Sequence, residues 1–553
     1  MKTKIAVKRS LSTIFLMNRR GIVLFNCVAL LLARGAIAST FTVTNTNDTG
    51  TGSLRQAILS SNGTTGPNII QFNIPGTGVH TISPLTVLPT ITQPVTIDGY
   101  TQPGSSVNTN ATTQGINAVI LIQLSGARAP ANSNFSGLTI DAASCTVRGL
   151  VISSFQHDAI DVCTNGNVIK GNFIGTNPAG TTALPNGAGG NGAIIFGFCG
   201  TPANCTVGGT TPDARNLISG NTGSGIGLGN GSGNTVQGNL IGTDITGTKA
   251  LGNGVGVTSN GTSDLIGGAT VAARNIISAN NRGIDLGSGS KNTVQSNFIG
   301  TDVTGTKALG NPNVGVNTQG TSNLIGGLTT TPGRPPGNLI SGNNGGSGVI
   351  LFSPSAQGNL IEGNIIGADI TGAKALGNLP GGIQINGPDN TVGGASAKAR
   401  NIIAFNGGST PECNATVAGI WVHNNAAINN ALLGNSIFSN AGLGIDLEFD
   451  GDPNCVEPND NCDVDTGPNN LQNYPDLTSA SSNGISTTVQ GTLNSKASTK
   501  FRVEFFANDL CDPSEHGEGQ TFLGATNVTT NSTCVATINA RLQAASITTV
   551  TSS

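Results

Sequence analysis

The chain has 553 residues, a net charge of −3 and only 10% charged residues. This balance offers no basic stripe and so argues against a nucleic acid partner. Glycine is abundant at 81 residues, and aromatic residues make up 4%. Helical repeat proteins are instead rich in Ala, Leu, Glu and Lys, so the composition favours short strands and tight turns.

Residues 1–38 have the features of a secretory signal peptide. A long basic region precedes the apolar run 21–33, and Ala36-Ile37-Ala38 fits a small-residue cleavage site. We therefore expect a mature chain that begins near Ser39 and is secreted or held at the cell surface. No segment after residue 40 is apolar enough to span a bilayer, so no transmembrane span is expected there.

Residues 39–135 differ from the repeats that follow, and we interpret them as an N-terminal cap plus the first coils. Ser53 is a suitable cap for a short helix, SLRQAILSS, with Leu54, Ala57 and Ile58 on one apolar face. Strands are predicted at FTVTNTND, IIQFNI, TITQPVTIDGY and AVILIQL. A solenoid needs such a cover, because an open edge would recruit other chains.

The segment 136–450 is dominated by a repeat that predicts a parallel β-helix. A pattern of the type Gly-[Ile/Val]-x-[Val/Leu/Ile] returns about every thirty residues, and a fixed period of this size is typical of a solenoid. We expect ten such strands stacked in register. The copies start at Ala159, Ala193, Gly225, Gly254, Gly283, Val314, Gly348, Gly382, Gly419 and Gly444.

A second repeat has twice this period. NTVQGNLIGTDITGTKALGN from Asn234 returns as NTVQSNFIGTDVTGTKALGN from Asn292, so two coils form one unit. Asn recurs at one coil position, as in Asn216, Asn275, Asn338 and Asn401. Stacked coils would align these side chains into amide ladders, which predicts a structural role for them.

The same strands suggest where a ligand could bind. In Gly-Ile-x-Leu the Ile and Leu point inward and x points outward, which gives an outward column. We expect this column to contain Asp161, a residue near Ile195, Gly227, Gly256, Asp285, Gly315, Ile350, Gln384, Trp421 and Asp446. Asn386, His423 and Glu448 would form a neighbouring column. The candidate ligand-binding residues are therefore Gln384, Trp421, His423, Asp446 and Glu448, because a sugar ring can stack on an indole while polar neighbours bind its hydroxyls. The alternative is that a loop or the C-terminal module covers Trp421.

Residues 451–475 form an acidic linker. Asp450, Asp452 and Asn454 space oxygen ligands as calcium loops do, but without a complete EF-hand pattern. The expected cofactor is therefore none, with calcium in this segment as the alternative. Residues 476–553 alternate as strands do at STTVQGTLN, KFRVEFFAND, QTFLGATNV and CVATINARL, which predicts a β-sandwich module that ends early.

Because an exported chain reaches an oxidising environment, we expect disulfides. Short loops favour Cys199–Cys205 and Cys455–Cys462, whereas Cys145–Cys163 and Cys511–Cys534 are candidates across neighbouring strands and leave Cys413 over. Sequence alone does not determine the pairing. The absence of Cys-x-x-Cys and His-x-x-x-His spacings gives no support to a structural zinc site of that type.

The segments FTVTNTNDTGTGSLRQAILSSN and FNIPGTGVHTISPLTVLPTITQPVTIDGYTQPG, followed by repeated IGTDxTGTKALGN, resemble one family in particular. They are similar to exported bacterial right-handed parallel β-helix repeat proteins with a CSLREA-type N-terminal segment, within the pectin-lyase-like fold group. The resemblance covers roughly residues 40–475, and residues 466–553 are similar to the module that often follows. It implies fold, export and a surface role, without an agreed reaction.

We expect a protein that presents an extended surface for adhesion or glycan binding, with an extracellular glycan or a cell-surface component as partner. The alternative is a polysaccharide lyase or glycoside hydrolase of the pectin-lyase-like fold. Polygalacturonase-like sites need paired Asp residues and a His-Gly pair, and the coils contain neither. Asp161 and Asp285 lie about four coils apart, or about 19 Å at about 4.8 Å per coil, too far for a glycosidase pair. Catalysis is therefore not expected, and no catalytic residue is assigned.

Overall fold

The computed structural model describes residues 38–130, 135–189, 192–197, 199–408, 418–447, 456–509, 516–543 and 549–552. The predicted signal peptide therefore lies outside the described residues, apart from its last residue. Across the described ranges, no helix combines the length and the apolar character needed to cross a membrane.

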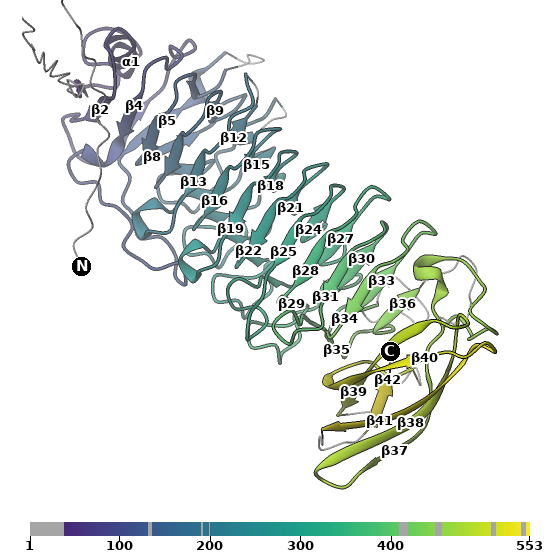
Figure 1. Cartoon of the computed structure of the whole chain (residues 1–553). Coiled ribbons are helices and arrows are strands. Elements are labelled where there is room, and N and C mark those ends of the chain that lie inside the picture. Colours follow the sequence, from purple (N-terminus) through teal and green to yellow (C-terminus); the bar gives the residue numbers. More distant parts are fainter. Residues whose placement is uncertain are drawn as a thin grey trace, which may run out of the picture. The chain divides into compact units, whose positions relative to one another are not determined.

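Three long parallel sheets form the body of the molecule, with 13, 12 and 11 strands among the described residues. Each complete coil contributes one strand to sheet 1, then one to sheet 2, then one to sheet 3, so strands of successive coils lie side by side (Figure 1). Parallel crossovers of this kind are right-handed. The predicted all-β, right-handed parallel β-helix is confirmed.

The strands of sheet 1 are β1 (Thr40–Val43), β2 (Asn68–Phe72), β4 (Val95–Asp98), β7 (Thr146–Arg148), β10 (Val168–Lys170), β13 (Thr206–Gly208), β16 (Thr235–Gln237), β19 (Leu265–Gly267), β22 (Thr293–Gln295), β25 (Leu324–Gly326), β28 (Leu360–Glu362), β31 (Thr391–Gly393) and β34 (Ala431–Leu433). Those of sheet 2 are β3 (His80–Ile82), β5 (Ile122–Ser125), β8 (Leu150–Ser153), β11 (Phe173–Ile174), β14 (Leu217–Ile218), β17 (Leu240–Ile241), β20 (Ile276–Ile277), β23 (Phe298–Ile299), β26 (Leu339–Ile340), β29 (Ile365–Ile366), β32 (Ile402–Ala404) and β35 (Ser436–Phe438). Those of sheet 3 are β6 (Leu138–Ile140), β9 (Ile160–Val162), β12 (Gly192–Phe196), β15 (Ser224–Gly227), β18 (Val255–Thr258), β21 (Arg282–Asp285), β24 (Val316–Thr318), β27 (Val349–Leu351), β30 (Ile383–Ile385), β33 (Ile420–Val422) and β36 (Ile445–Leu447).

The predicted Gly-Ile-x-Leu strands are the strands of sheet 3, but two of them pair in a different register from the one expected. Ile226 pairs with Val257, and Ile284 pairs with Val316. The equivalent segments are therefore GVTS from Gly256 and GVNT from Gly315, and in both the outward position lies two residues later than predicted, at Thr258 and Asn317. The last inward position of each becomes a buried hydroxyl, Ser259 or Thr318.

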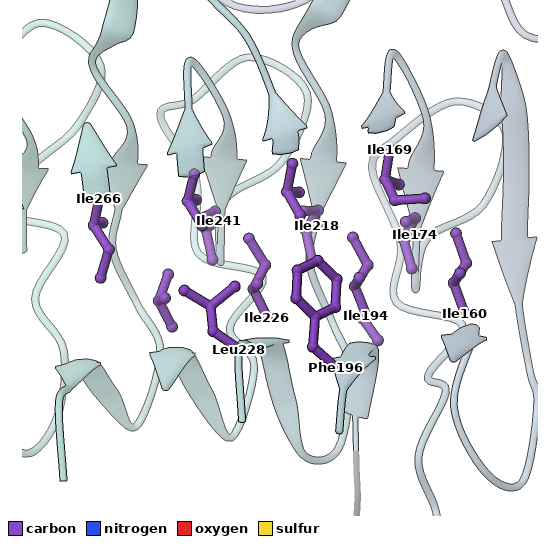
Figure 2. Packing of buried hydrophobic residues seen from close by; sticks show 14 of the residues in the cluster. Ile160, Ile169, Ile174, Ile194, Phe196, Ile218, Ile226, Leu228, Ile241 and Ile266 are labelled. Carbon is purple, nitrogen blue, oxygen red and sulfur yellow. The ribbon is translucent and has the colours of Figure 1, made fainter. Parts of the chain in front are cut away.

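The core is a row of aliphatic side chains repeated from coil to coil. Ile160, Ile194 and Ile226 of sheet 3 extend toward Ile174, Ile218 and Ile241 of sheet 2 (Figure 2). All six are 0% exposed. Burial of each such side chain contributes about 1.5–3 kcal/mol relative to an exposed one, and stacking is what removes it from water.

Three amide ladders run along the three corners of the coils. The first lies between sheets 1 and 2, where each Asn donates from Nδ2 to Oδ1 of the Asn in the next coil, at 2.9–3.3 Å. Its members are Asn172, Asn216, Asn239, Asn275, Asn297, Asn338, Asn364, Asn401 and Asn435. The four predicted ladder residues are therefore confirmed, and an Asn of the intervening coil lies between each pair.

The second ladder follows sheet 2 and the third precedes sheet 1. Asn253 Nδ2 donates to Asn280 Oδ1 at 2.8 Å in the second, and the Asn234 amide N–H donates to Asp264 Oδ1 at 2.8 Å in the third. Asp264 thus occupies a position that is Asn in the following coil, Asn292. The corners repeat because each coil supplies the acceptor for its neighbour.

Hairpin loops of the IGTDxTGTKAL repeat project after sheet 2 on every second coil. Each is closed by an antiparallel bridge, such as Thr243 with Ala250 and Thr301 with Ala308. The loops contact one another across the intervening coil: the Val303 amide donates to the Gly247 carbonyl at 2.9 Å. This spacing accounts for the double period in the sequence.

The N-terminal end of the β-helix carries α1 (Leu54–Asn62), which is the predicted helix. The Ser53 hydroxyl accepts a hydrogen bond from the Gln56 amide at 3.2 Å, as its capping role requires. Leu54, Ala57 and Ile58 are buried, and α1 lies beside the first strands (Figure 1).

The C-terminal module contains two three-stranded antiparallel sheets among the described residues. Their strands are β37 (Asp476–Ser482), β38 (Ser486–Asn494), β41 (Val535–Gln543), β39 (Lys500–Asn508), β40 (Thr521–Thr529) and β42 (Thr549–Ser552). Glu518 accepts from Asn440 Nδ2 at 2.9 Å, and Glu504 accepts from the Gly434 amide at 2.7 Å. The module therefore supplies acceptors at the end of the second amide ladder and beside the end of the first.

The predicted disulfide pairings are wrong. Cys163 bonds to Cys199 and Cys462 bonds to Cys534, with Cα–Cα distances of 5.0 and 5.1 Å. Cys205 is a free thiol at 0% exposure, because it occupies a ladder position and accepts from the Asn167 amide inside the coil. The short segment between Cys199 and Cys205 is therefore not closed by a disulfide. Cys145 is also free and buried, while Cys413, Cys455 and Cys511 lie outside the described residues.

Candidate functional site

The outward column of sheet 3 is continuous. The register joins Asp161, Ile195, Gly227, Thr258, Asp285, Asn317, Ile350, Gln384, Trp421 and Asp446 in that order. The predicted members Gly256 and Gly315 are wrong, and Thr258 and Asn317 stand in their places. Neighbouring members lie about 4.8 Å apart, the spacing of hydrogen-bonded strands.

Trp421 and His423 form an aromatic surface on β33 and the residues after it. Their ring centroids are 4.6 Å apart, at an interplanar angle of 43°. Both side chains are partly exposed. The indole Nε1 of Trp421 is buried and has no hydrogen-bond partner within the described ranges, so the exposed part of Trp421 excludes its N–H group. This surface can stack against a flat apolar face.

Two amide side chains lie on the preceding coil. Gln384 pairs with Trp421 across adjacent strands. Its Nε2 donates to Asn386 Oδ1 at 3.0 Å, and Asn386 Nδ2 donates to the Phe352 carbonyl at 3.0 Å. Phe352 itself is 55% exposed, which is unusual for a large apolar side chain in this molecule. Sequence reasoning missed Phe352, although it directly follows the inward Leu351 just as Asn386 follows Ile385.

We call Phe352, Gln384, Asn386, Trp421 and His423 the C-terminal strip. Asp446 continues the column beyond Trp421, as expected, but is only 6% exposed and offers little surface to a ligand. Glu448, the fifth predicted residue, lies outside the described residues. The strip therefore combines aromatic and amide groups, and no open carboxylate among its described members.

The middle of the column is also polar. Asp285 was expected to be an isolated outward carboxylate. Instead, it lies 2.9 Å from Arg282 Nη1 and accepts from Asn317 Nδ2 at 3.0 Å. Asn317 was not predicted as a member of the column, because Gly315 was expected in its place. Because the carboxylate already has these partners, this part of the column offers a ligand less free hydrogen-bonding capacity than the C-terminal strip does.

The arginines that recur in the coils have structural roles. Arg215 Nε donates to the Gly238 carbonyl at 3.0 Å, and Arg274 Nε donates to the Ser296 carbonyl at 3.0 Å, in each case one coil further on. Arg400 Nε does the same to Gly434 at 3.2 Å. Burial lowers the pKa of Arg215 to about 10. A lyase-like arginine base would have to reach substrate, whereas Arg215 is only 1% exposed.

The acidic segment contains a described trio, Asp460, Asp463 and Asp465, whose carboxylate oxygens lie within 4.8 Å of one another. Burial raises the pKa of Asp465, and the neighbouring Asp460, Asp463 and Glu457 raise it further. Oxygen-only donor sets suit Ca²⁺. The residues predicted for calcium, Asp450, Asp452 and Asn454, lie outside the described residues, so calcium binding in this segment stays a prediction.

A cavity of about 610 Å³ lies between the last coils and the C-terminal module. It is lined by apolar groups such as Leu433 and Ile445 and by polar groups such as Tyr474, His516 and Glu518. Glu504 and Glu518 also line it, and both hydrogen-bond to the end of the coils. These carboxylates thus connect the C-terminal module to the last coils. Because they already have this structural role, the cavity is a weaker candidate for a ligand site than the strip.

A third polar group lies at the N-terminal end of sheet 3. Asp161 is 3% exposed and lies beside His157 and Asp158, with one ligand atom of each residue within 4.8 Å of the others. Sequence reasoning treated Asp161 as isolated. The run His157-Asp158-x-x-Asp161 was a signal that could have drawn attention to it.

No protein-family model matches the chain, and no curated protein matches it. Similarity to solved structures is low. A pectate lyase, Pel9A, shares 12% identity over 53% of this chain and 71% of its own, with a TM-score of 0.27. The enzymatically active domain and the full length of tailspike protein 2 from an Escherichia coli O157:H7 bacteriophage each share 9% identity over 91% of this chain, with TM-scores of 0.28 and 0.29. The chain spans 66% and 59% of those two tailspike chains. At these scores the strand pairing, and not the similarity, defines the fold.

Proposed function

We propose that this is an exported cell-surface or secreted β-helix protein that binds glycans through the C-terminal strip and so acts in adhesion. The sequence resemblance to exported β-helix repeat proteins with a CSLREA-type segment supports export and a surface role. The disulfides Cys163–Cys199 and Cys462–Cys534 are consistent with an oxidising compartment.

The observation that carries the proposal is the position of the Trp421–His423 aromatic surface next to the Gln384–Asn386 amide pair. Sugar rings have apolar faces that stack on aromatic side chains and hydroxyl edges that bond to amides. Gln384 has an amide oxygen in addition to the Nε2 that bonds to Asn386. A ligand along the column would therefore find stacking and hydrogen-bonding groups on adjacent coils.

The alternative, a polysaccharide lyase or glycoside hydrolase, has less support. Acid–base cleavage of a glycosidic bond needs two carboxyl groups that both reach the substrate. Asp158 and Asp161 are close together, but they are 0% and 3% exposed, so a polymer chain cannot contact them in this arrangement. Asp446 is buried as well.

The test is a glycan array probed with the mature chain, followed by titration of any ligand found. Replacing Trp421 with Ala should weaken binding at least about tenfold, or about 1.4 kcal/mol, because the stacking surface is lost. Phe352→Ala should weaken it less, since Phe352 lies two coils away. The matched control is Leu328→Ala, which removes a 56% exposed apolar side chain outside the strip and should leave binding unchanged.

Binding that survives Trp421→Ala would contradict the assignment of the strip. Release of unsaturated or reducing ends from a polysaccharide by the mature chain would favour the enzymatic alternative.

A further inference from the structure

The group formed by His157, Asp158 and Asp161 lies at the start of sheet 3, far along the column from the C-terminal strip. His157 and Asp158 occupy the turn between β8 and β9, and Asp161 is the central residue of β9. Their exposures are 7%, 0% and 3%. Two carboxylates and an imidazole are thus gathered in a place that water barely reaches.

The side chains are held by specific contacts. Asp158 Oδ1 accepts from the amide of Gly192, the first residue of β12, at 2.7 Å. Asp158 Oδ2 lies 2.9 Å from His157 Nδ1, and Ser136 Oγ lies 3.1 Å from the same nitrogen. Because Ser136 and Asp158 meet the same ring nitrogen, the three do not form a nucleophile–base–acid relay, in which the two ring nitrogens have different partners.

Asp161 provides the second, independent observation. Its Oδ1 is buried and has no hydrogen-bond partner in the part of the chain that the structure describes. Leaving a buried carboxylate oxygen without a partner is costly. This oxygen belongs to a residue whose ligand atom lies within 4.8 Å of those of His157 and Asp158.

We propose that His157, Asp158 and Asp161 bind a divalent first-row metal ion, with Zn²⁺ as the ion that fits best. One imidazole nitrogen and two carboxylate oxygens within 4.8 Å of one another form a mixed nitrogen and oxygen donor set for such an ion. Imidazole and carboxylate are common Zn²⁺ ligands, whereas Ca²⁺ takes six to eight oxygen ligands. Because the group is buried, the ion would be structural and would join the turn before β9 to the strand itself.

The experiment uses the full mature chain, treated with a chelator, dialysed, and titrated with Zn²⁺ alone by calorimetry. We expect uptake of one ion per chain and a higher Tm in the presence of Zn²⁺, because an ion that binds only the folded chain stabilises it. Asp161→Asn should weaken uptake by at least about tenfold and remove the Zn²⁺-dependent rise in Tm. The control Asp285→Asn changes a carboxylate of the same column that lies outside the group, and it should retain both.

The absence of Zn²⁺ uptake by the native chain would overturn the proposal, and this result does not depend on the folding of any variant. Undiminished uptake by Asp161→Asn would place the ion elsewhere and overturn it too. A parallel titration with Ca²⁺ alone tests the choice of ion: uptake of Ca²⁺ but not Zn²⁺, lost in Asp161→Asn, would overturn the assignment of a first-row metal.

Discussion

The amide ladders and the outward column of sheet 3 run along the same coils, yet their sequences behave in opposite ways. The first ladder is Asn in every described coil from Asn172 to Asn435, while the column changes from Asp to Ile, Gly, Thr, Gln and Trp. A ladder residue is both donor and acceptor for its neighbours, so each coil constrains the next. A column residue faces outward and need not match the residue in the next coil. Its identity can therefore vary along the column, as a ligand-binding surface requires.

The largest effect on stability is expected from Asn275→Ala. Asn275 Nδ2 donates to Asn297 Oδ1 at 2.9 Å and to the Val236 carbonyl at 2.8 Å, while its Oδ1 accepts from Asn239. Truncation leaves these buried groups without partners and should lower the free energy of unfolding by about 1–3 kcal/mol. Denaturant unfolding measures it. The exposed Asn281→Ala is the control, and equal stability losses in the two variants would contradict the ladder interpretation.

A smaller, pH-dependent effect is expected from Asp264→Asn. Burial raises the pKa of Asp264 above its usual value of 3.8, with hydrogen bonds from Ser259 and Asn234 acting against this. A carboxyl whose pKa is higher in the folded state adds stability below its unfolded pKa and loses it as pH rises through the folded pKa. The variant should therefore be more stable than the native chain at pH 7, and its advantage should shrink toward pH 4.

The equivalent pair two coils away shows how the amide would fit. Asn323 Nδ2 donates to Thr318 Oγ1 at 3.1 Å, and Thr318 is the counterpart of Ser259. An Asn at position 264 can donate to Ser259 in the same way. Unfolding curves at both pH values test this, and a variant less stable than the native chain at pH 7 would show that the carboxylate is required.

The smallest effect is expected from Gln384→Ala, which alters only the column. Its side chain bonds to Asn386 at the surface, so the free energy of unfolding should change by about 0.5 kcal/mol or less. Glycan binding should weaken nevertheless, if the C-terminal strip is the ligand site. A stability loss as large as that of Asn275→Ala would remove the distinction between ladder and column.

Sequence alone predicted the features that repetition enforces. The period, the inward aliphatic positions and the ladder residue Asn275 all follow from residues that must match one coil later. The predicted register was wrong at NGVGVTSN and NVGVNT, because each segment has two Val residues that can take the first inward position, and in both segments the later one, Val257 or Val316, does so. The polar inward residues Ser259 and Thr318 made the correct choice look less apolar than the wrong one.

Features that depend on a single coil could not be predicted. The partner of Cys199 is Cys163, 36 residues earlier, because one coil brings those positions together. The outward strand pattern predicted only Asp161 of the group His157, Asp158 and Asp161, because the other two residues precede the strand. The turn before β9 brings His157 and Asp158 close to Asp161. A turn that occurs only once leaves no periodic signal in the sequence.

The hairpin loops after sheet 2 have a consequence for how such a chain can change its length. Each loop contacts its counterpart two coils away, as Val303 does with Gly247. Insertion of a single coil between them would place the two loops three coils apart and break this contact. Insertion or deletion of a whole block, such as the 58 residues from Asn234 to Lys291, preserves every loop contact and every ladder acceptor, because Asn292 begins the same sequence again. We therefore expect unequal recombination to lengthen or shorten the molecule in steps of two coils, and these steps set the increments of its reach.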